Sequence, residues 1–303
     1  MITRDIDQFL RFARTCPLVF GPATAKAAFL VAPESFALAE QSASDNRYMD
    51  LDLGTDVEIA LAEHRRLQSA LSGSLPTICF PGLTDTPDGQ FPNNVFATAP
   101  GRLLLGHMRH PVRQREVERS DIREFFTGTL GYREIDLRAQ PGICELTGSL
   151  VIDHARGLGF CGLSERCDEA GAAAMHAAFG LRATLMFDLA PGEYHSNVVL
   201  SVLAGRAVVI APDGFADAAV VSAIEALYAP HSISLSPAQK ARFAGNCIAL
   251  SNRDVWMSRA AATSLQAAQH SLLEAAGFRV RSVPLGEIEK AGGSLRCCVA
   301  EIF

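Results

Sequence analysis

The sequence predicts an α/β protein in which five similar modules form a ring. Pairs of short apolar runs around a turn recur along the chain and indicate hairpins. Each complete pair is followed by a helical pattern and then by another short apolar run. Successive hairpins begin 55, 48, 49 and 49 residues apart. A repeat near fifty residues is typical of circular arrays, because closing the ring removes exposed strand edges. An ordinary α/β sheet with coincidental spacing is the alternative.

Four hairpins are predicted from apolar runs that flank turn residues. They are Val95–Ala99 with Leu103–Met108, Leu150–Asp153 with Leu158–Cys161, Val198–Leu203 with Ala207–Ile210, and Cys247–Leu250 with Val255–Ser258. A fifth start at Arg296 leaves no room for a second strand before Phe303. We therefore expect this last strand to pair with Ala27–Ala32, so that the two ends of the chain complete one module.

Helices are predicted from apolar residues at helical spacing, with Gly180 and Gly277 as stop signals after two of them. The predicted helices are Asp56–Leu71, Cys167–Phe179, Ala216–Tyr228 and Ser258–Ala276. The strands predicted to end the modules include Thr184–Phe187, Ile233–Leu235 and Arg279–Val283. Together these elements predict a single domain over residues 1–303.

Composition narrows the class of partner. The chain has 303 residues, 49% of them hydrophobic and 20% charged, as in globular proteins. A net charge of -6 and the lack of a basic cluster argue against nucleic acid or an anionic membrane surface as a partner. No apolar stretch reaches the roughly 18 residues of a membrane span. A small molecule is the expected partner.

The cysteines and histidines indicate reduced thiols and no metal site. Eight cysteines occur without a CxxC pair or a regular framework, and no histidine spacing is typical of metal ligands. Asp5 and Asp7 lie where a signal peptide would need an apolar core. These features predict a cytoplasmic protein that needs no metal, nucleotide or organic cofactor.

Polar residues precede each hairpin start at the same point of the repeat. The segments are PDGQFPNN (Pro87–Asn94), CELTGS (Cys144–Ser149), GEYHSN (Gly192–Asn197), FAGN (Phe243–Asn246) and GGSLRC, which ends at Cys297. If the modules surround an axis, these segments converge at its mouth. The pocket predicted there contains Asp88, Asn94, Glu145, Ser149, His195, Asn197, Asn246 and Cys297.

Cys297 is the candidate nucleophile. It follows the Gly292-Gly293 pair at the predicted start of a strand, where a side chain is both accessible and held in place. The alternative is that Cys297 and Cys298 are small apolar residues of a buried terminal strand.

These segments together resemble the amidinotransferase or guanidino-modifying superfamily, which includes arginine deiminases and dimethylarginine dimethylaminohydrolases. The chain looks most similar to the branch of citrulline utilisation hydrolases. The matching segments are PDGQFPNNVF, ELTGSLVID, GLSERCD, YHSNVVL, FAGN and IEKAGGSLRCCVAEIF. The resemblance implies a five-module ββαβ α/β-propeller (pentein) with pseudo-five-fold symmetry and an active site at its centre.

The resemblance also implies catalytic roles. In this superfamily a cysteine thiolate attacks the central carbon of a guanidino group, an amine or ammonia leaves, and water resolves the covalent intermediate. Cys297 matches that nucleophile, and Cys298 should face the opposite side because strand side chains alternate. His195 matches the general acid and base, and Glu145 resembles the carboxylate that binds the substrate nitrogens.

Further residues match substrate-binding positions. Asp88 matches a second acidic position, although an Asp between Pro and Gly also serves as a turn residue. Arg166 and Arg115 match arginines that hold the α-carboxylate of the substrate. Arg113 and Arg119 compete with Arg115 for that role.

Departures from the family pattern indicate the substrate. Asn94 replaces an Asp that many guanidine-acting relatives carry, and the stretch that follows Glu145 lacks a second acid. Burying a guanidinium without enough opposing charge costs several kcal/mol, roughly, whereas a ureido group is neutral. Asn94, Ser149 and Asn197 offer the mixed donors and acceptors that a ureido group needs. We therefore expect a citrulline-like substrate to be tolerated or preferred.

Three other functions remain open at this point. An amidinotransferase would pass the covalent amidino group to an amine, and a dimethylarginine dimethylaminohydrolase would release a methylated amine. A catalytically silent propeller would only bind an amino acid or a protein. Members of the superfamily often form dimers, so the resemblance also implies a homodimer as one option.

Overall fold

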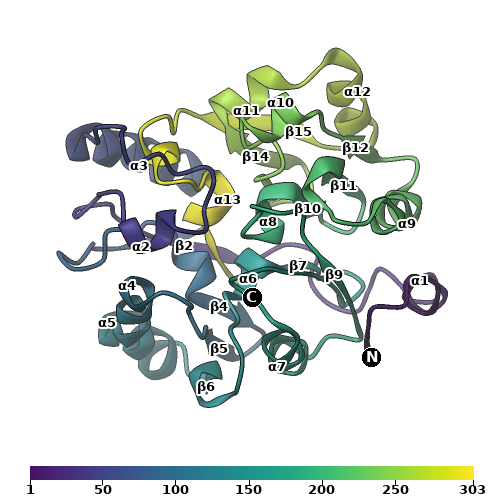
Figure 1. The fold of residues 1–303 in the computed structure, drawn as a ribbon, viewed down its shortest axis with the longest axis horizontal. Helices are drawn as coiled ribbons and strands as arrows, with labels where there is room; N and C mark the ends of the chain where they lie inside the picture. Colours follow the sequence, from purple (N-terminus) through teal and green to yellow (C-terminus); the bar gives the residue numbers. More distant parts are fainter.

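The computed structural model describes residues 1–303 and contains five separate small β-sheets. The fold is α/β, as predicted. In every sheet the first two strands of the module are antiparallel and the third is parallel to the second. Helices such as α3, α7 and α9 lie around the outside of the molecule, while the short helices α6, α8 and α13 lie near its centre (Figure 1).

Each module has the predicted order of strand, strand, helix and strand. The module that joins the two ends of the chain contains β16 (Ala300–Ile302), β2 (Ala27–Val31), α3 (Val57–Ser72) and β3 (Thr77–Phe80). The next two modules contain β4 (Phe96–Ala99), β5 (Arg102–Leu105), α4 (Pro111–Gln114), α5 (Ser120–Glu124) and β6 (Arg133–Asp136), and then β7 (Leu150–Asp153), β8 (Leu158–Leu163), α7 (Glu169–Phe179) and β9 (Ala183–Asp188). The last two contain β10 (Leu200–Leu203), β11 (Ala207–Ile210), α9 (Ala218–Tyr228) and β12 (Ser232–Ser234), and then β13 (Ile248–Ala249), β14 (Asp254–Ser258), α11 (Arg259–Ser264), α12 (Ala267–Ala275) and β15 (Arg279–Val283).

The two ends of the chain meet in one sheet, which confirms the expected pairing. β16 is antiparallel to β2, with Ala300 opposite Phe29, and β2 is parallel to β3. Near the other end of the chain, β1 (Ile2–Thr3) adds a fourth strand beside β9, and α1 (Ile6–Ala13) follows it. Neighbouring modules touch through their first strands, as β16 does with β4 and β10 does with both β7 and β13.

The prediction of one continuous helix over Ser258–Ala276 is wrong, because the structure has two helices in this range, α11 and α12. Leu265 has an extended backbone with ψ 140° between α11 and α12. Gln266 then caps α12, and its side chain and that of Gln269 exchange hydrogen bonds with the two backbone N–H groups. The apolar spacing continues across the break, so periodicity alone could not reveal it.

A single helical turn precedes the first strand of four modules, and in two of them, at Val198 and at Arg296, it replaces the start of a predicted strand. These turns are Pro92–Asn94, α6 (Leu146–Ser149), α8 (Ser196–Val199) and α13 (Leu295–Cys298). Consequently β10 begins at Leu200 and β16 at Ala300, later than expected. These turns carry the polar segments and deliver them to the centre of the molecule.

Two further short helices complete the chain, α2 (Glu40–Ala43) and α10 (Pro237–Lys240). Apolar side chains of the sheets and outer helices form four buried clusters, the largest of which spans the modules around β8, β11 and β14. None of the helices combines the length and the apolar character that crossing a membrane would require.

Candidate active site

Cys297 lies at the end of the short helix α13 and not at the start of a strand. Its backbone N–H donates to the carbonyl of Ser294 at 3.0 Å. The argument that Cys298 faces the opposite side of a strand is therefore wrong. Both side chains are buried, and successive residues of a helical turn still point in different directions.

Asn246 holds the thiol of Cys297. Its Nδ2 donates to Sγ at 3.2 Å, and its Oδ1 accepts from the backbone N–H of Arg296 at 3.0 Å. Asn197 Oδ1 lies 3.8 Å from the same sulfur. Burial raises the pKa of the Cys297 thiol, although the hydrogen bond from Asn246 opposes this effect. In the free protein the group is therefore a thiol that has a donor ready to stabilise the thiolate.

The Gly292-Gly293 pair permits a close approach, as predicted. Gly292 has φ +73°, and a Cβ there would lie 2.2 Å from Asn46 Nδ2. A Cβ on Gly293 would lie 2.9 Å from the ring of Phe91. Only glycine fits both positions without displacing neighbours.

His195 and Glu145 form a buried pair beside the thiol. His195 Nε2 lies 2.9 Å from Glu145 Oε2, and neither side chain is exposed. Burial opposes the charge of Glu145, but Arg166 and His195 hold the pKa of this carboxyl well below its usual range. The carboxylate therefore accepts the Nε2 proton, and Nδ1 of His195 is left without a hydrogen-bond partner.

No hydrogen bond joins His195 to Cys297, and the two side chains are instead linked through neighbours. The ring of Tyr194 lies 4.5 Å from that of His195, and Tyr194 also lines the hollow that contains Cys297. A Cβ on Gly148 would lie 2.8 Å from both His195 Nδ1 and Asn94 Oδ1. The missing side chain of Gly148 therefore keeps space open on the free side of the imidazole.

The hollow beside the thiol, which we call the thiol pocket, is small and lined by residues from several modules. Its lining residues are Ser42, Asn46, Met49, Asp88, Phe91, Asn94, Arg113, Arg166, Tyr194, Ala291, Gly293 and Cys297. Asp88 Oδ1 and Asn94 Oδ1 are buried there without a hydrogen-bond partner. Buried polar atoms are almost always paired in folded proteins, so unpaired acceptors in a hollow indicate a missing ligand.

Two predicted residues are placed differently from expectation. Ser149 is fully buried, and its hydroxyl donates to the carbonyl of Arg166 at 3.4 Å instead of lining the thiol pocket. Arg115 is exposed and does not line the thiol pocket, so its role in holding a substrate carboxylate stays a prediction. Arg113 lines the pocket instead, because residues two positions apart on a helix face different sides. Arg119 is buried elsewhere, against Asp121 and the carbonyl of Pro81.

No sequence pattern predicted the segment that covers the thiol pocket. Ser42 Oγ donates to Asp88 Oδ2 at 2.5 Å, and Asn46 Nδ2 donates to the carbonyl of Gly292 at 3.3 Å. Tyr194, also unassigned before, donates its hydroxyl hydrogen to the same carbonyl at 2.5 Å. No periodic pattern marks residues 40–49, whereas Tyr194 adjoins His195 in the YHSN stretch and could have been inferred from it.

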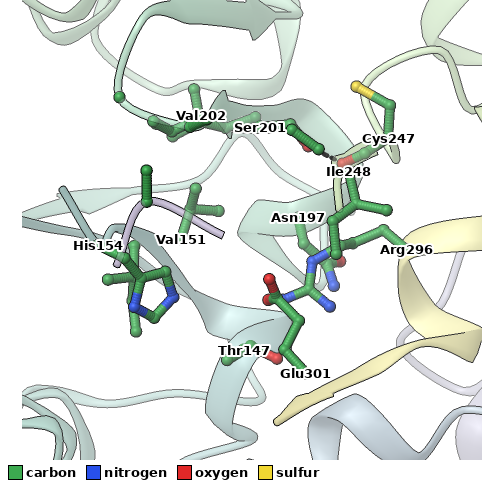
Figure 2. A pocket seen from close by; sticks show the side chains of 16 residues that line it. Thr147, Val151, His154, Asn197, Ser201, Val202, Cys247, Ile248, Arg296 and Glu301 are labelled. Atoms are coloured by element: carbon green, nitrogen blue, oxygen red, sulfur yellow. Dashed lines mark hydrogen bonds and ion pairs between the residues drawn. The ribbon is translucent and has the colours of Figure 1, made fainter. Parts of the chain in front are cut away.

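A larger hollow is lined by Asn197, His154 and Arg296, and we call it the Arg296 pocket (Figure 2). Arg296 pairs there with Glu301 at 3.0 Å, and its Nη1 donates to the carbonyl of Val299. Burial raises the pKa of the Cys247 thiol to about 12. The charged groups Arg296 and Glu301 are paired with each other here, whereas Asn197 Nδ2 has no partner.

No group of three histidine, cysteine or acidic side chains is arranged to hold a metal ion. The thiol pocket thus brings together Cys297, Asp88, Asn94 and Arg166 from segments far apart in the sequence. His195, Glu145, Asn197 and Asn246 contact these residues or one another. A thiol, an imidazole with a free nitrogen and unpaired acceptors are the groups that covalent hydrolysis requires.

Known proteins resemble this chain along most of its length. A model of the family described as N,N dimethylarginine dimethylhydrolase, eukaryotic, matches residues 32–303. An N(G),N(G)-dimethylarginine dimethylaminohydrolase from Mycobacterium tuberculosis is 28% identical over 271 residues, which cover 89% of this chain and 83% of that protein.

Two solved structures share the fold. The N-terminal domain of ArgZ, an arginine dihydrolase from the ornithine-ammonia cycle in cyanobacteria, was determined with bound substrate and superposes with a TM-score of 0.78 at 19% identity, covering 91% of this chain and 97% of that chain. A dimethylarginine dimethylaminohydrolase adduct with S-methyl-L-thiocitrulline superposes with a TM-score of 0.70 at 19% identity, covering 92% of this chain and 100% of that chain.

Proposed function

The chain belongs to the dimethylarginine dimethylaminohydrolase family, and from this premise we propose that it hydrolyses the terminal carbon–nitrogen bonds of a ureido or guanidino amino acid through the thiol of Cys297. It is a hydrolase that acts on carbon–nitrogen bonds other than peptide bonds. The observation that carries the proposal is the thiol pocket, in which a donor to the sulfur lies beside unpaired acceptors.

We also infer that the five sheets form one domain, an α/β-propeller with pseudo-five-fold symmetry. Three facts support this inference. The sheets share one internal order, the two ends of the chain complete one of them, and neighbouring modules touch through their first strands. In such an arrangement, the helical turns that precede the first strands meet at the centre.

In the first step the sulfur of Cys297 attacks the ureido or guanidino carbon. A carbon–sulfur bond forms, the bond to the leaving nitrogen breaks, and the thiol proton passes through His195 to that nitrogen. Burial lowers the pKa of His195, so its imidazole starts neutral and Nδ1 can accept a proton. Asn246 donates to the developing thiolate.

In the second step water replaces the sulfur. Nδ1 of His195 takes a proton from water as the oxygen attacks the same carbon, and the carbon–sulfur bond breaks to restore the thiol. Glu145 keeps the other ring nitrogen protonated and the ring oriented throughout. For a ureido substrate the first product is ammonia, and the resulting carbamic acid separates into an amine and carbon dioxide.

The pocket favours a neutral ureido group as well as a cationic one. Among the buried carboxylate oxygens only Asp88 Oδ1 lacks a hydrogen-bond partner, because both oxygens of Glu145 are occupied. Asn94 offers a second acceptor without charge. Asn197 Nδ2 is a buried donor without a partner, and a donor of this kind suits a ureido carbonyl oxygen. Asn197 lines the Arg296 pocket and not the thiol pocket, but its Oδ1 lies 3.8 Å from the sulfur of Cys297.

Steady-state assays with citrulline, arginine and methylated arginines test this function, with mass spectrometry of the quenched enzyme. We expect turnover of citrulline and a covalent adduct on the peptide that contains Cys297. Turnover confined to the cationic guanidines would contradict the ureido preference. The absence of both turnover and adduct with every compound would contradict the proposed hydrolysis.

A further inference from the structure

Residues 40–49, which we call the cover segment, lie over the thiol pocket. Ser42 and Asn46 fasten it to Asp88 and to the carbonyl of Gly292. Met49 forms an antiparallel bridge with Ala291, on the far side of the same hollow. The lining residues are almost fully buried as a result, and Cys297 is 1% exposed. A substrate can reach the sulfur only if the cover segment moves.

The guanidinium of Arg166, the expected partner of a substrate carboxylate, is already occupied. Its Nε and Nη2 both donate to Asp45 Oδ1, at 3.0 and 2.5 Å. Nη2 also donates to the carbonyl of Ser42 at 2.8 Å, and Nη1 lies 3.5 Å from Glu145 Oε2. All three nitrogens therefore have a partner. Two of the three acceptor atoms, Asp45 Oδ1 and the carbonyl oxygen of Ser42, belong to the cover segment.

Asp45 holds Arg166 as a substrate carboxylate would. Two donors of one guanidinium meet one oxygen of the Asp45 carboxylate, which makes a charge-assisted contact of the kind that a substrate carboxylate would make. Burial alone would raise the pKa of Asp45, but Arg166 and His110 bring it below its ordinary value. The residue is therefore an anion, and it competes with any other carboxylate for Arg166.

The second oxygen of Asp45 has partners of its own. Oδ2 lies 2.9 Å from His110 Nε2 and 3.4 Å from Arg109 Nε. Neither group lines the thiol pocket. If Asp45 releases Arg166, these two groups can keep it solvated and paired, so that the exchange leaves no buried charge alone.

We propose that Asp45 is a specificity-determining residue that holds the cover segment closed by occupying Arg166, and that the substrate α-carboxylate displaces it on binding. This inference rests on the proposed function. A substrate that carries the carboxylate can make the exchange, whereas its decarboxylated analogue cannot. Asp45 thus competes with the α-carboxylate for Arg166, and this competition weakens the binding of α-amino acids more than that of the corresponding amines.

Asp45→Asn tests the proposal, because asparagine has the same shape and lacks the charge. In the ligand-free enzyme we expect amide hydrogen exchange over residues 40–49 to become about tenfold faster, as one charge-assisted pair is weakened. Asp188→Asn breaks an exposed pair with Arg4 far from the pocket and should leave that exchange unchanged. Exchange that is equal in Asp45→Asn and the wild type would overturn the proposed latch.

The second readout compares citrulline with N-carbamoylputrescine, which differs only by lacking the α-carboxylate. In Asp45→Asn the KM for citrulline should fall by about tenfold more than the KM for the amine, because Arg166 is released for the carboxylate. Asp45→Glu keeps the charge and should retain the wild-type ratio. A ratio that is unchanged in Asp45→Asn, or that moves toward the amine, would overturn the proposal. If the wild type turned over neither compound nor any guanidine, the proposed function would fail, while the exchange experiment would still test the latch.

Discussion

The Arg296 pocket and the thiol pocket differ in a way that size does not reveal. The Arg296 pocket is the larger of the two, yet the smaller thiol pocket contains the Cys297 sulfur, which accepts a hydrogen bond from Asn246. In the larger hollow the charged groups satisfy each other, as Arg296 and Glu301 do. In the smaller one, Asp88 and Asn94 each keep a buried oxygen unpaired. Unsatisfied polar atoms, and not volume, distinguish a reactive site from a structural gap.

Exchanging one cysteine in each hollow gives the largest expected difference. Cys297→Ser should lower kcat by at least about 10⁴-fold, because a hydroxyl in this setting is a far weaker nucleophile than a thiol. Cys247→Ser should change kcat by less than about twofold. Steady-state kinetics measure both effects. Equal losses in the two variants would remove the distinction between the hollows.

The histidines provide the second comparison. His195→Asn should reduce kcat by about 10²- to 10⁴-fold, the usual contribution of a general acid and base. His154 lines the Arg296 pocket, where its ring stacks 4.0 Å from that of Phe303. His154→Asn should therefore lower stability and leave kcat almost unchanged. A large kcat loss in His154→Asn would show that the Arg296 pocket participates in the reaction.

Filling the space beside His195 should have a smaller effect. The Cβ of Gly148→Ala would lie 2.8 Å from His195 Nδ1, so the ring must shift by several tenths of an ångström. We expect kcat/KM to fall by about 10²-fold, as misplacement of a catalytic group generally causes. Val202→Ala, in the Arg296 pocket, is the matched control and should be close to the wild type. Full activity in Gly148→Ala would place the reacting atoms elsewhere.

Restoring an acid at position 94 should shift substrate preference. In Asn94→Asp the unpaired acceptor becomes charged, which stabilises a guanidinium more than a ureido group. The ratio of kcat/KM for arginine over citrulline should rise by about tenfold, the scale of one additional charge-assisted hydrogen bond. Competition assays with both substrates measure that ratio directly. If the ratio stayed constant, the inference that the lack of a charge at position 94 favours a ureido substrate would be wrong.

The smallest expected effect concerns acid stability. Burial lowers the pKa of His195, with Glu145 opposing, so the folded state keeps the ring neutral. The unfolded chain takes up a proton near pH 6.5, roughly, and stability therefore falls as the pH drops below that value. Between pH 7 and 5.5 the loss due to His195 should be about 1 kcal/mol in urea unfolding. His195→Asn should flatten this part of the curve, and parallel curves would contradict the assignment.

The order of the elements could be read from the sequence because each module repeats the same sequence of apolar runs. The pairing of β2 with β16 followed from a strand start without a partner and an apolar run without one. The residues at which helices begin and end within that order were harder to predict from the sequence. The break at Leu265 interrupts no periodicity, so only local backbone contacts specify it.

Within the site, the sequence located the residues that belong to the repeat and missed those that do not. Cys297, Asn94 and His195 all occur just before a module begins, and this shared phase predicted that they meet. Whether Arg113 or Arg115 lines the thiol pocket depends on how the short helix α4 is rotated about its axis. Sequence spacing from a distant motif does not determine that rotation. Asp45 lies in an irregular segment, whose contacts with Arg166 arise only in the folded chain.

The pairing of β2 with β16 has a consequence for how activity emerges during folding. β16 begins two residues after α13 ends, at Ala300, so the nucleophile is positioned only when this strand docks against the opposite end of the chain. Bringing together segments so distant in sequence carries a large loop-closure entropy and is slow. Recovery of turnover after dilution from denaturant should thus trail the recovery of helical circular dichroism, which makes the enzyme a reporter of its own last assembly event.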